Sequence, residues 1–262
     1  MPVKLLFIGD VIGKPGREAL SRELHRIVDR HMVDLVIANG ENAAGGFGLT
    51  EETAQDLFKC GVQMITSGNH IWDKKDALEY IKREDRIVRP ANYPEGTPGK
   101  GTTIVKTPGG VKVGILNLEG RVFMNNLDCP FRCADREIAK LKEETPIVFV
   151  DFHAEATSEK VSLGWYLDGR VAAVIGTHTH VQTADERILT AGTAYMTDAG
   201  MTGAFDSVIG VKKEEAILKF VTQRPSKFEV AKKDIRINGV VIEVDEKTGL
   251  ARNIERLNIA CG

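Results

Sequence analysis

Short apolar runs alternate with longer segments of helical pattern over the first third of the chain. The runs typical of buried strands lie at residues 4–8, 34–38 and 62–66. The segments that predict helices lie near residues 15–30, 50–60 and 73–82. Pro15 suits a first helical turn and Thr50 is a good N-cap. This alternation predicts parallel strands joined by crossover helices.

The middle and the end of the chain follow another pattern. A tight turn joins two expected strands, 101–106 and 111–118, into a hairpin. After a loop over 119–133, a helix near 134–142, strands at 147–150 and 172–175, and a helix near 213–220 are expected. The tail alternates apolar and polar residues around turns, which is typical of antiparallel strands. We therefore expect one mixed α/β domain spanning residues 1–262.

Composition narrows the class of protein. The 262 residues are 42% apolar and 27% charged, as in ordinary soluble globular proteins. A net charge of -2 argues against a basic nucleic-acid scaffold but leaves room for a small phosphate-bearing ligand. No apolar stretch approaches the ~18 residues of a membrane span, and Asp10 interrupts the N-terminal run. We expect a cytoplasmic protein that does not bind membranes.

Side chains that carry a carboxylate, an amide or an imidazole follow five of the expected strands. In open α/β sheets, ligands bind beyond the carboxyl ends of the strands, so these residues should meet at one edge. They are Asp10, Glu41, Asn42, Asn69, His70, His153, His178 and His180. Taken singly, each has an ordinary explanation, because Asp and Asn cap turns and a lone histidine is usually structural. Their convergence at five strand ends favours a metal site.

The side-chain chemistry limits the metal. Carboxylate, amide oxygen and imidazole, without thiolate, suit Mn, Fe or Zn. Seven candidate ligands are too many for one tetrahedral zinc, but they suit two metals ~3.5–4 Å apart that share a carboxylate and a water. A hydroxide bridging the two ions would be a ready nucleophile at neutral pH. These ligands are Asp10, Glu41, Asn42, Asn69, His153, His178 and His180.

Several motifs together resemble a known superfamily. GNH and GTHTH after successive strands are similar to the GNH and GHxH motifs of the calcineurin-like metallophosphoesterases. The longer motifs resemble its bacterial YmdB-like branch, which acts on 2′,3′-cyclic nucleotides. These are GDVIGKPGR, NGENAAGGFG, SGNHIWD, RPANYP, DFHAEATSEK and MTDAGMTG. The resemblance spans roughly Leu5 to Gly210.

The resemblance implies a fold and a role for each candidate residue. The fold is a four-layer α/β/β/α sandwich with two mixed sheets. One metal would be held by Asp10, Glu41, Asn42 and His180. The other would be held by Glu41, Asn69, His153 and His178, so that Glu41 bridges the two. His70 would donate a proton or stabilise the transition state.

The sequence departs from the superfamily at its first motif. The usual Asp-x-His is missing, because Val11 and Ile12 follow Asp10, and Glu41 stands where an aspartate usually bridges. If Asn42 replaces the lost histidine, oxygen replaces nitrogen, which favours a harder ion. We therefore expect two divalent ions, Mn or Fe before Zn.

The function expected from these features is metal-dependent hydrolysis of phosphodiester bonds, with 2′,3′-cyclic nucleotides as substrates. Two alternatives stay open: a phosphomonoesterase or 5′-nucleotidase with the same site, and a metal- or nucleotide-binding regulator with little turnover. RNA and a second copy of the chain stay open as partners. Phe47, in the glycine-rich run 43–48, could stack on a base, or the run could be only a flexible turn.

Overall fold

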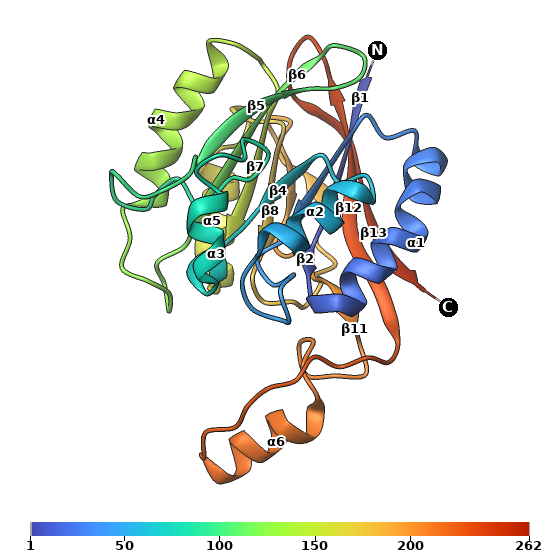
Figure 1. Cartoon of the computed structure of the whole chain (residues 1–262). Helices are drawn as coiled ribbons and strands as arrows, with labels where there is room; N and C mark the ends of the chain where they lie inside the picture. Colours follow the sequence, from blue (N-terminus) through green and yellow to red (C-terminus); the bar gives the residue numbers. More distant parts are fainter. Residues whose placement is uncertain (1, 262) are drawn as a thin grey trace.

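The computed structural model describes residues 2–261 and contains two β-sheets that pack face to face (Figure 1). The first sheet has the strand order β2-β11-β12-β1-β3-β4, and β13 pairs with β12. Its strands are β1 (Pro2–Ile8), β2 (Asp10–Val11), β3 (Leu35–Asn39), β4 (Met64–Thr66), β11 (Met201–Ala204), β12 (Ile235–Asp245) and β13 (Ala251–Ala260).

The second sheet has the strand order β5-β6-β7-β8-β10-β9. Its strands are β5 (Thr102–Lys106), β6 (Lys112–Glu119), β7 (Val148–His153), β8 (Ala173–Thr177), β9 (Arg187–Ile188) and β10 (Ala194–Met196). Strands β6, β7 and β8 are parallel, whereas β5 pairs with β6 as an antiparallel hairpin. In the first sheet, β1 pairs in parallel with β3 and antiparallel with β12, so both sheets are mixed.

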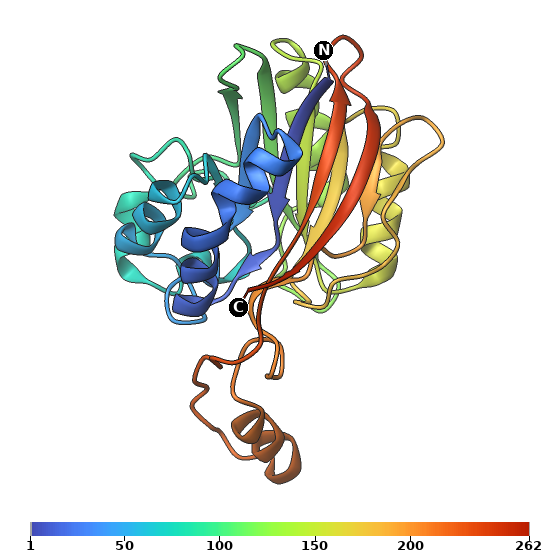
Figure 2. The same cartoon turned by 90° about the vertical axis from the view of Figure 1, so that its right-hand side faces the viewer.

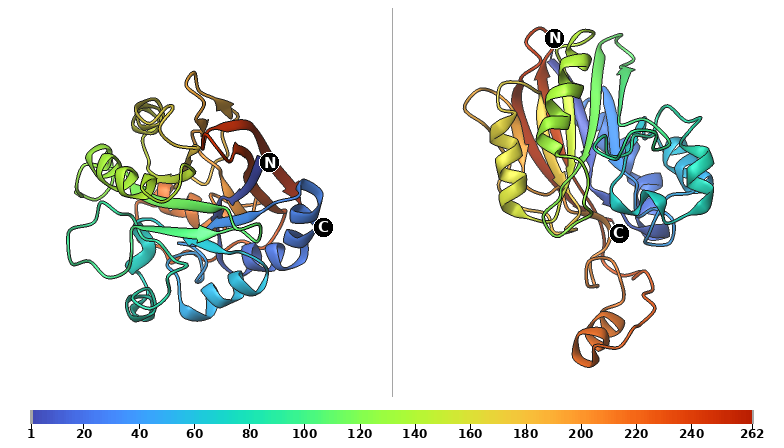
Figure 3. Two further views of the ribbon diagram at one scale, coloured as in Figure 1. Left: turned by 90° about the horizontal axis from the view of Figure 1, so that it is seen from above. Right: turned by 90° about the vertical axis from the view of Figure 1, so that its left-hand side faces the viewer.

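Helices cover the outer faces of the two sheets, as the view from above shows (Figure 3). They are α1 (Gly13–His31), α2 (Glu51–Lys59), α3 (Lys75–Tyr80), α4 (Pro130–Lys142) and α5 (Thr157–Tyr166). The chain also forms the 3₁₀ helix η1 (Asn69–Trp72) and helix α6 (Lys213–Thr222), which does not cover a sheet. Apolar clusters fill the space beneath α1 and α2, between the sheets, and beneath α4 and α5. This confirms the expected four-layer α/β/β/α arrangement.

Most expected elements are present. Strands β1, β3 and β4 pair in parallel, and Thr50 caps α2 with a reciprocal capping box to Thr53. Two expected boundaries were wrong. Helix α4 begins at Pro130, inside the expected loop, because proline suits a first helical turn. Strand β7 extends to His153 because its pairing with β6 and β8 continues that far. Helix α5 and the short strands β9, β10 and β11 were not expected.

The carboxyl ends of the parallel strands of both sheets lie at one edge, at the bottom of Figure 1. Helix α6 projects beyond this edge, away from the layered body (Figures 1 and 2). Among residues 2–261, the helices are all too short or too polar to cross a bilayer.

The contact between the sheets gives a stability prediction. The buried rings of Phe7 in β1 and Phe149 in β7 lie 5.0 Å apart, centroid to centroid. Because Phe149→Ala leaves a cavity between the sheets, it should lower the free energy of unfolding by ~3–5 kcal/mol. The midpoint of urea denaturation measures this loss. The control Phe123→Ala, at a side chain 88% exposed, should change it by less than about 0.5 kcal/mol. An unchanged midpoint for Phe149→Ala would contradict the packing described here.

Candidate metal centre

The eight polar residues predicted from the strand ends lie together at the lower edge of the sheets. Asp10 lies in β2, Glu41 and Asn42 follow β3, Asn69 opens η1 after β4, His153 ends β7, and His178 and His180 follow β8. His70 is the second residue of η1. The burial is deep, since the side chains of Glu41 and His153 are 1% and 0% exposed. The fold thus brings all eight residues to one place.

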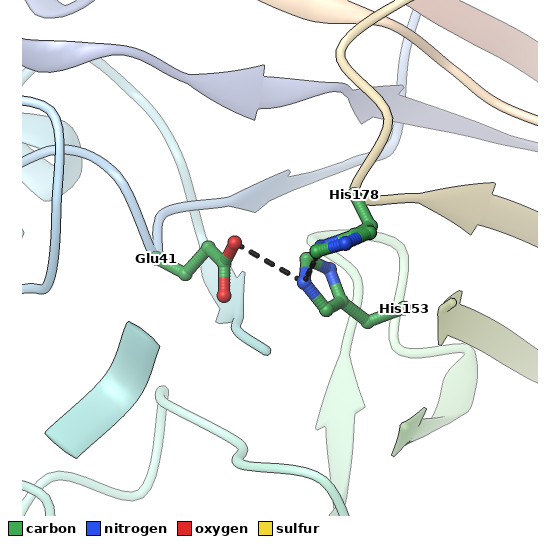
Figure 4. Close-up of side chains that lie close together, drawn as sticks. All are labelled: Glu41, His153 and His178. Carbon is green, nitrogen blue, oxygen red and sulfur yellow. Dashed lines mark hydrogen bonds and ion pairs between the residues drawn. The ribbon is translucent and has the colours of Figure 1, made fainter. Parts of the chain in front are cut away.

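One ligand group surrounds the Nε2 atom of His153 (Figure 4). Glu41 Oε1 lies 3.1 Å from this nitrogen, His178 Nδ1 lies 3.0 Å from it, and Asn69 Oδ1 lies 2.9 Å from it. A single N–H can serve only one such acceptor well, whereas a cation among them would satisfy all four atoms. The crowding of acceptor atoms therefore suits a metal ion better than a hydrogen-bond network.

A second group lies on the other side of Glu41. Asp10, Glu41 and His180 each place one ligand atom within 4.8 Å of the others. The amide nitrogen of Asn42 lies 3.1 Å from both Glu41 Oε1 and His180 Nε2. Exchanging the two ends of the Asn42 amide would turn its oxygen toward these atoms.

Two buried side-chain oxygens in the residues of this second group lack hydrogen-bond partners in the described part of the chain. Asp10 Oδ1 and Asn42 Oδ1 are buried without a hydrogen-bond partner among residues 2–261. A buried polar atom without a partner costs free energy, roughly 1–3 kcal/mol. A divalent cation would remove this cost for Asp10 Oδ1, and also for Asn42 Oδ1 once the two ends of the amide are exchanged. The residues present therefore fit a metal ion.

Glu41 belongs to both groups, and its surroundings fix its carboxylate. Its Oε2 atom accepts a hydrogen bond from the backbone N–H of His70, at 3.1 Å. A Cβ atom on Gly68 would lie 2.4 Å from Oε2 and 2.3 Å from His153 Nε2. Glycine is thus required where η1 approaches the cluster. The backbone on one side and the two ligand groups on the other hold the carboxylate between them.

Burial and charge set the protonation of the metal-free cluster. Burial raises the pKa of Asp10 to about 6. Burial alone would lower the pKa of His153, but the carboxylates of Glu41, Asp10 and Asp151 raise it to about 9. Burial and the charge on His153 lower the pKa of His178 to about 3. The metal-free site therefore keeps a proton on His153 as its counter-charge, at the place where a cation would bind.

His70 lies at the margin of the cluster. Its Nδ1 atom is 2.8 Å from the carboxylate of Asp73, which orients the ring. The ring of Phe47 contacts that of His70 edge-on, with centroids 5.1 Å apart. The side chain is 29% exposed. His70 is therefore accessible to a ligand, unlike the buried residues beside it.

Two residues missed in the sequence orient the ring of His153. Its Nδ1 atom lies 2.9 Å from the hydroxyl of Thr177, which donates to Asp151 at 2.7 Å. With Thr177 donating to Asp151, the His153 Nδ1–H donates to Thr177, and Nε2 is left to face Glu41 and Asn69. Asp151 stands in the DFH motif, but only the pairing of β7 with β8 shows what it does.

A buried ion pair holds the loop that carries His178 and His180. Lys160 and Asp198 are each 1% exposed, and their charged atoms are 2.6 Å apart. Asp198 also accepts hydrogen bonds from the N–H and hydroxyl of Thr179, the residue between the histidines. Lys160 donates to the carbonyl of Thr177 at 2.7 Å.

The held loop is strained. His178 and His180 have φ angles of 100° and 64°, a region that costs free energy for any residue with a Cβ atom. The ion pair of Lys160 and Asp198 fastens Thr177 and Thr179, the residues on either side of His178. Sequence reasoning missed both residues, although they stand in the motifs DFHAEATSEK and MTDAGMTG.

The chain is similar to several known proteins. The family model described as "YmdB-like protein" matches residues 6–257. A 2′,3′-cyclic-nucleotide 2′-phosphodiesterase of Bacillus subtilis (strain 168) is 51% identical, covering 98% of this chain and 97% of its own.

Two solved structures are also similar over nearly their whole length. A crystal structure of a hypothetical protein from Thermus thermophilus has a TM-score of 0.92 and 44% identity, covering 98% of this chain and 99% of its own. That of a novel phosphatase from Mycoplasma pneumoniae has a TM-score of 0.93 and 37% identity, covering 99% and 94%. Together with the family model, these similarities show that the chain belongs to the YmdB-like protein family.

Proposed function

We propose that the protein is a divalent-metal-dependent phosphodiesterase that hydrolyses 2′,3′-cyclic nucleotides. The observation that carries the proposal is the position of Glu41, whose carboxylate belongs to two adjacent groups of metal-ligand atoms. The activity named for the Bacillus subtilis relative, 51% identical, supports the choice of substrate. The description of the Mycoplasma pneumoniae relative as a phosphatase keeps phosphomonoesters as a second candidate.

The proposed ligands divide between two cations. Asp10, Glu41, Asn42 and His180 would hold one, and Glu41, Asn69, His153 and His178 would hold the other. When bound, two such cations supply an activated water as nucleophile and balance the charge on the phosphoryl oxygens. The amide oxygens of Asn42 and Asn69 favour manganese or iron(II) over zinc.

His70 is proposed to act on the leaving group. Its ring is partly exposed beside the cluster, and its backbone N–H is bonded to Glu41, which fixes its distance from the ligands. Asp73 contacts one ring nitrogen and so orients the ring, which lets His70 protonate the leaving alkoxide or stabilise the charge on it.

The first prediction concerns Glu41→Gln. Because both ligand groups share this carboxylate, the variant should bind Mn²⁺ poorly at both sites. It should also lose more than about 100-fold in kcat/KM for 2′,3′-cyclic AMP, which exceeds the loss expected for a residue that only orients the ligands. Chromatography of the nucleoside monophosphate product and metal analysis after dialysis measure the two losses. Glu155→Gln is the control, because it removes only a carboxylate that lies 3.2 Å from His178. It should lose less Mn²⁺ affinity and less activity than Glu41→Gln. Near-wild-type turnover in Glu41→Gln would refute the assignment.

The second prediction separates His70 from the ligands. His70→Asn keeps the backbone bond to Glu41 and should keep Mn²⁺ binding, while kcat falls by roughly 10²–10⁴, as expected for loss of a general acid. Steady-state kinetics and Mn²⁺ titration of the same preparation check this. Unchanged kcat, or loss of metal in parallel with activity, would exclude the proposed role.

The third prediction concerns the buried ion pair. Lys160→Met should weaken Mn²⁺ binding on the order of 10–100-fold, as loss of a residue that orients ligands does. Isothermal titration of the metal-free protein measures the affinity, and thermal unfolding measures stability. Tyr195→Phe is the control, because it removes a buried hydrogen bond to Thr197 without touching the histidine loop. If both variants lose stability but keep wild-type affinity, Lys160 has only a structural role.

A further inference from the structure

A segment outside the layered body borders the candidate metal centre. Residues 205–234, here called the arm, leave the first sheet after β11, form α6 and return to β12. The arm projects beyond the edge where the parallel strands end (Figures 1 and 2). Only Ala216 of α6 is buried, and its side chains Phe220 and Val221 are 73% and 77% exposed. The arm therefore contributes little to the core of the body.

The root of the arm contacts a metal-ligand residue directly. The backbone carbonyl of Ile209 accepts a hydrogen bond from His180 Nδ1, at 2.8 Å. This bond leaves His180 Nε2 to face Asn42 and Asp10. The position of the arm and the orientation of His180 are thus linked.

The arm also packs against the glycine-rich run. A Cβ atom on Gly46 would lie 3.0 Å from the side chain of Val230, and one on Gly13 would lie 3.1 Å from it. Both glycines have positive φ angles, 99° and 55°. These glycines let the returning chain of the arm approach the body closely. The run that holds Phe47 is therefore a docking surface for the arm.

A cavity of about 240 Å³ lies between the arm and the body. Its walls include Phe47 from the glycine-rich run, Phe220 and Phe228 from the arm, and His180 from the cluster. Phe47 also contacts His70, so one ring borders both the cavity and the candidate metal centre. The ammonium of Lys219, 4.9 Å from the ring centroid of Phe228, adds positive charge to the wall.

We propose that this cavity binds the nucleobase of a nucleotide whose phosphate lies at the cluster; the proposal rests on the function proposed above. Aromatic walls stack on any base, and the cation favours an anionic ligand. The volume lies below the ~300–1,000 Å³ of pockets for drug-sized ligands, so it suits one base. The site therefore accepts mononucleotides and discriminates weakly between purine and pyrimidine.

The test compares a nucleotide with a substrate that lacks a base. Phe220→Ala and Phe228→Ala should each lower kcat/KM for 2′,3′-cyclic AMP about tenfold through KM, within the range for loss of one stacking ring. The base-free diester glycerol 1,2-cyclic phosphate should be hydrolysed as by wild type. Val221→Ala, on the same helix but outside the cavity wall, is the matched control and should change neither substrate.

Other outcomes separate the inference from the proposed function. If wild type hydrolyses both diesters and the phenylalanine variants lose neither or both equally, the cavity does not bind the base. A loss confined to Asn258→Ala, in the neighbouring cavity beside His180, would place the base there instead and overturn the proposal.

If wild type hydrolyses neither diester, the proposed function fails, and binding of adenosine tests the cavity alone. In saturation-transfer NMR, adenosine should give a clear signal on wild type and Val221→Ala and a much weaker one on Phe220→Ala, in line with the loss of one stacking ring. Equal signals for all three would overturn the proposal.

Discussion

The structure depends on the burial of one carboxylate. Glu41 follows β3 and has almost no contact with water, between two groups of imidazole, amide and carboxylate atoms. A buried charge is costly unless it is paired, and the metal-free cluster pairs it with a proton on His153. The surrounding oxygens of Asp10 and Asn42 have no such compensation. Divalent cations at this edge would resolve both problems together.

Outer contacts hold the cluster in place. Asp151 and Thr177 orient His153 from between the sheets, and the ion pair of Lys160 and Asp198 fastens the strained loop of His178. On the side of the cluster that borders the arm, the carbonyl of Ile209 accepts a hydrogen bond from His180 Nδ1 and so orients the His180 ring. The two sheets and the arm thus fix one site from three directions, and this precision is what a dinuclear phosphodiesterase would need.

The sequence predicted the eight inner residues, those of the candidate metal centre. It missed the residues that hold them in place, for a physical reason. The rule that ligands meet at the carboxyl ends of parallel strands identified all eight inner residues, and their binding role stays a prediction. Lys160 and Asp198 are 38 residues apart and act only through a long-range pairing. Helix α5, which carries Lys160, was missed because Gly164 lies against the Tyr195 ring and Trp165 is half exposed, so its pattern is weakly amphipathic. No local pattern shows that the arm returns to Gly46.

The most direct test of the account is anomalous diffraction from crystals of the protein grown with Mn²⁺, collected above and below the manganese edge. We expect two anomalous peaks, one on each side of the Glu41 carboxylate, within bonding distance of His180 on one side and His153 on the other. A single peak, or two peaks that do not share Glu41, would contradict the central claim that this carboxylate joins two metal sites.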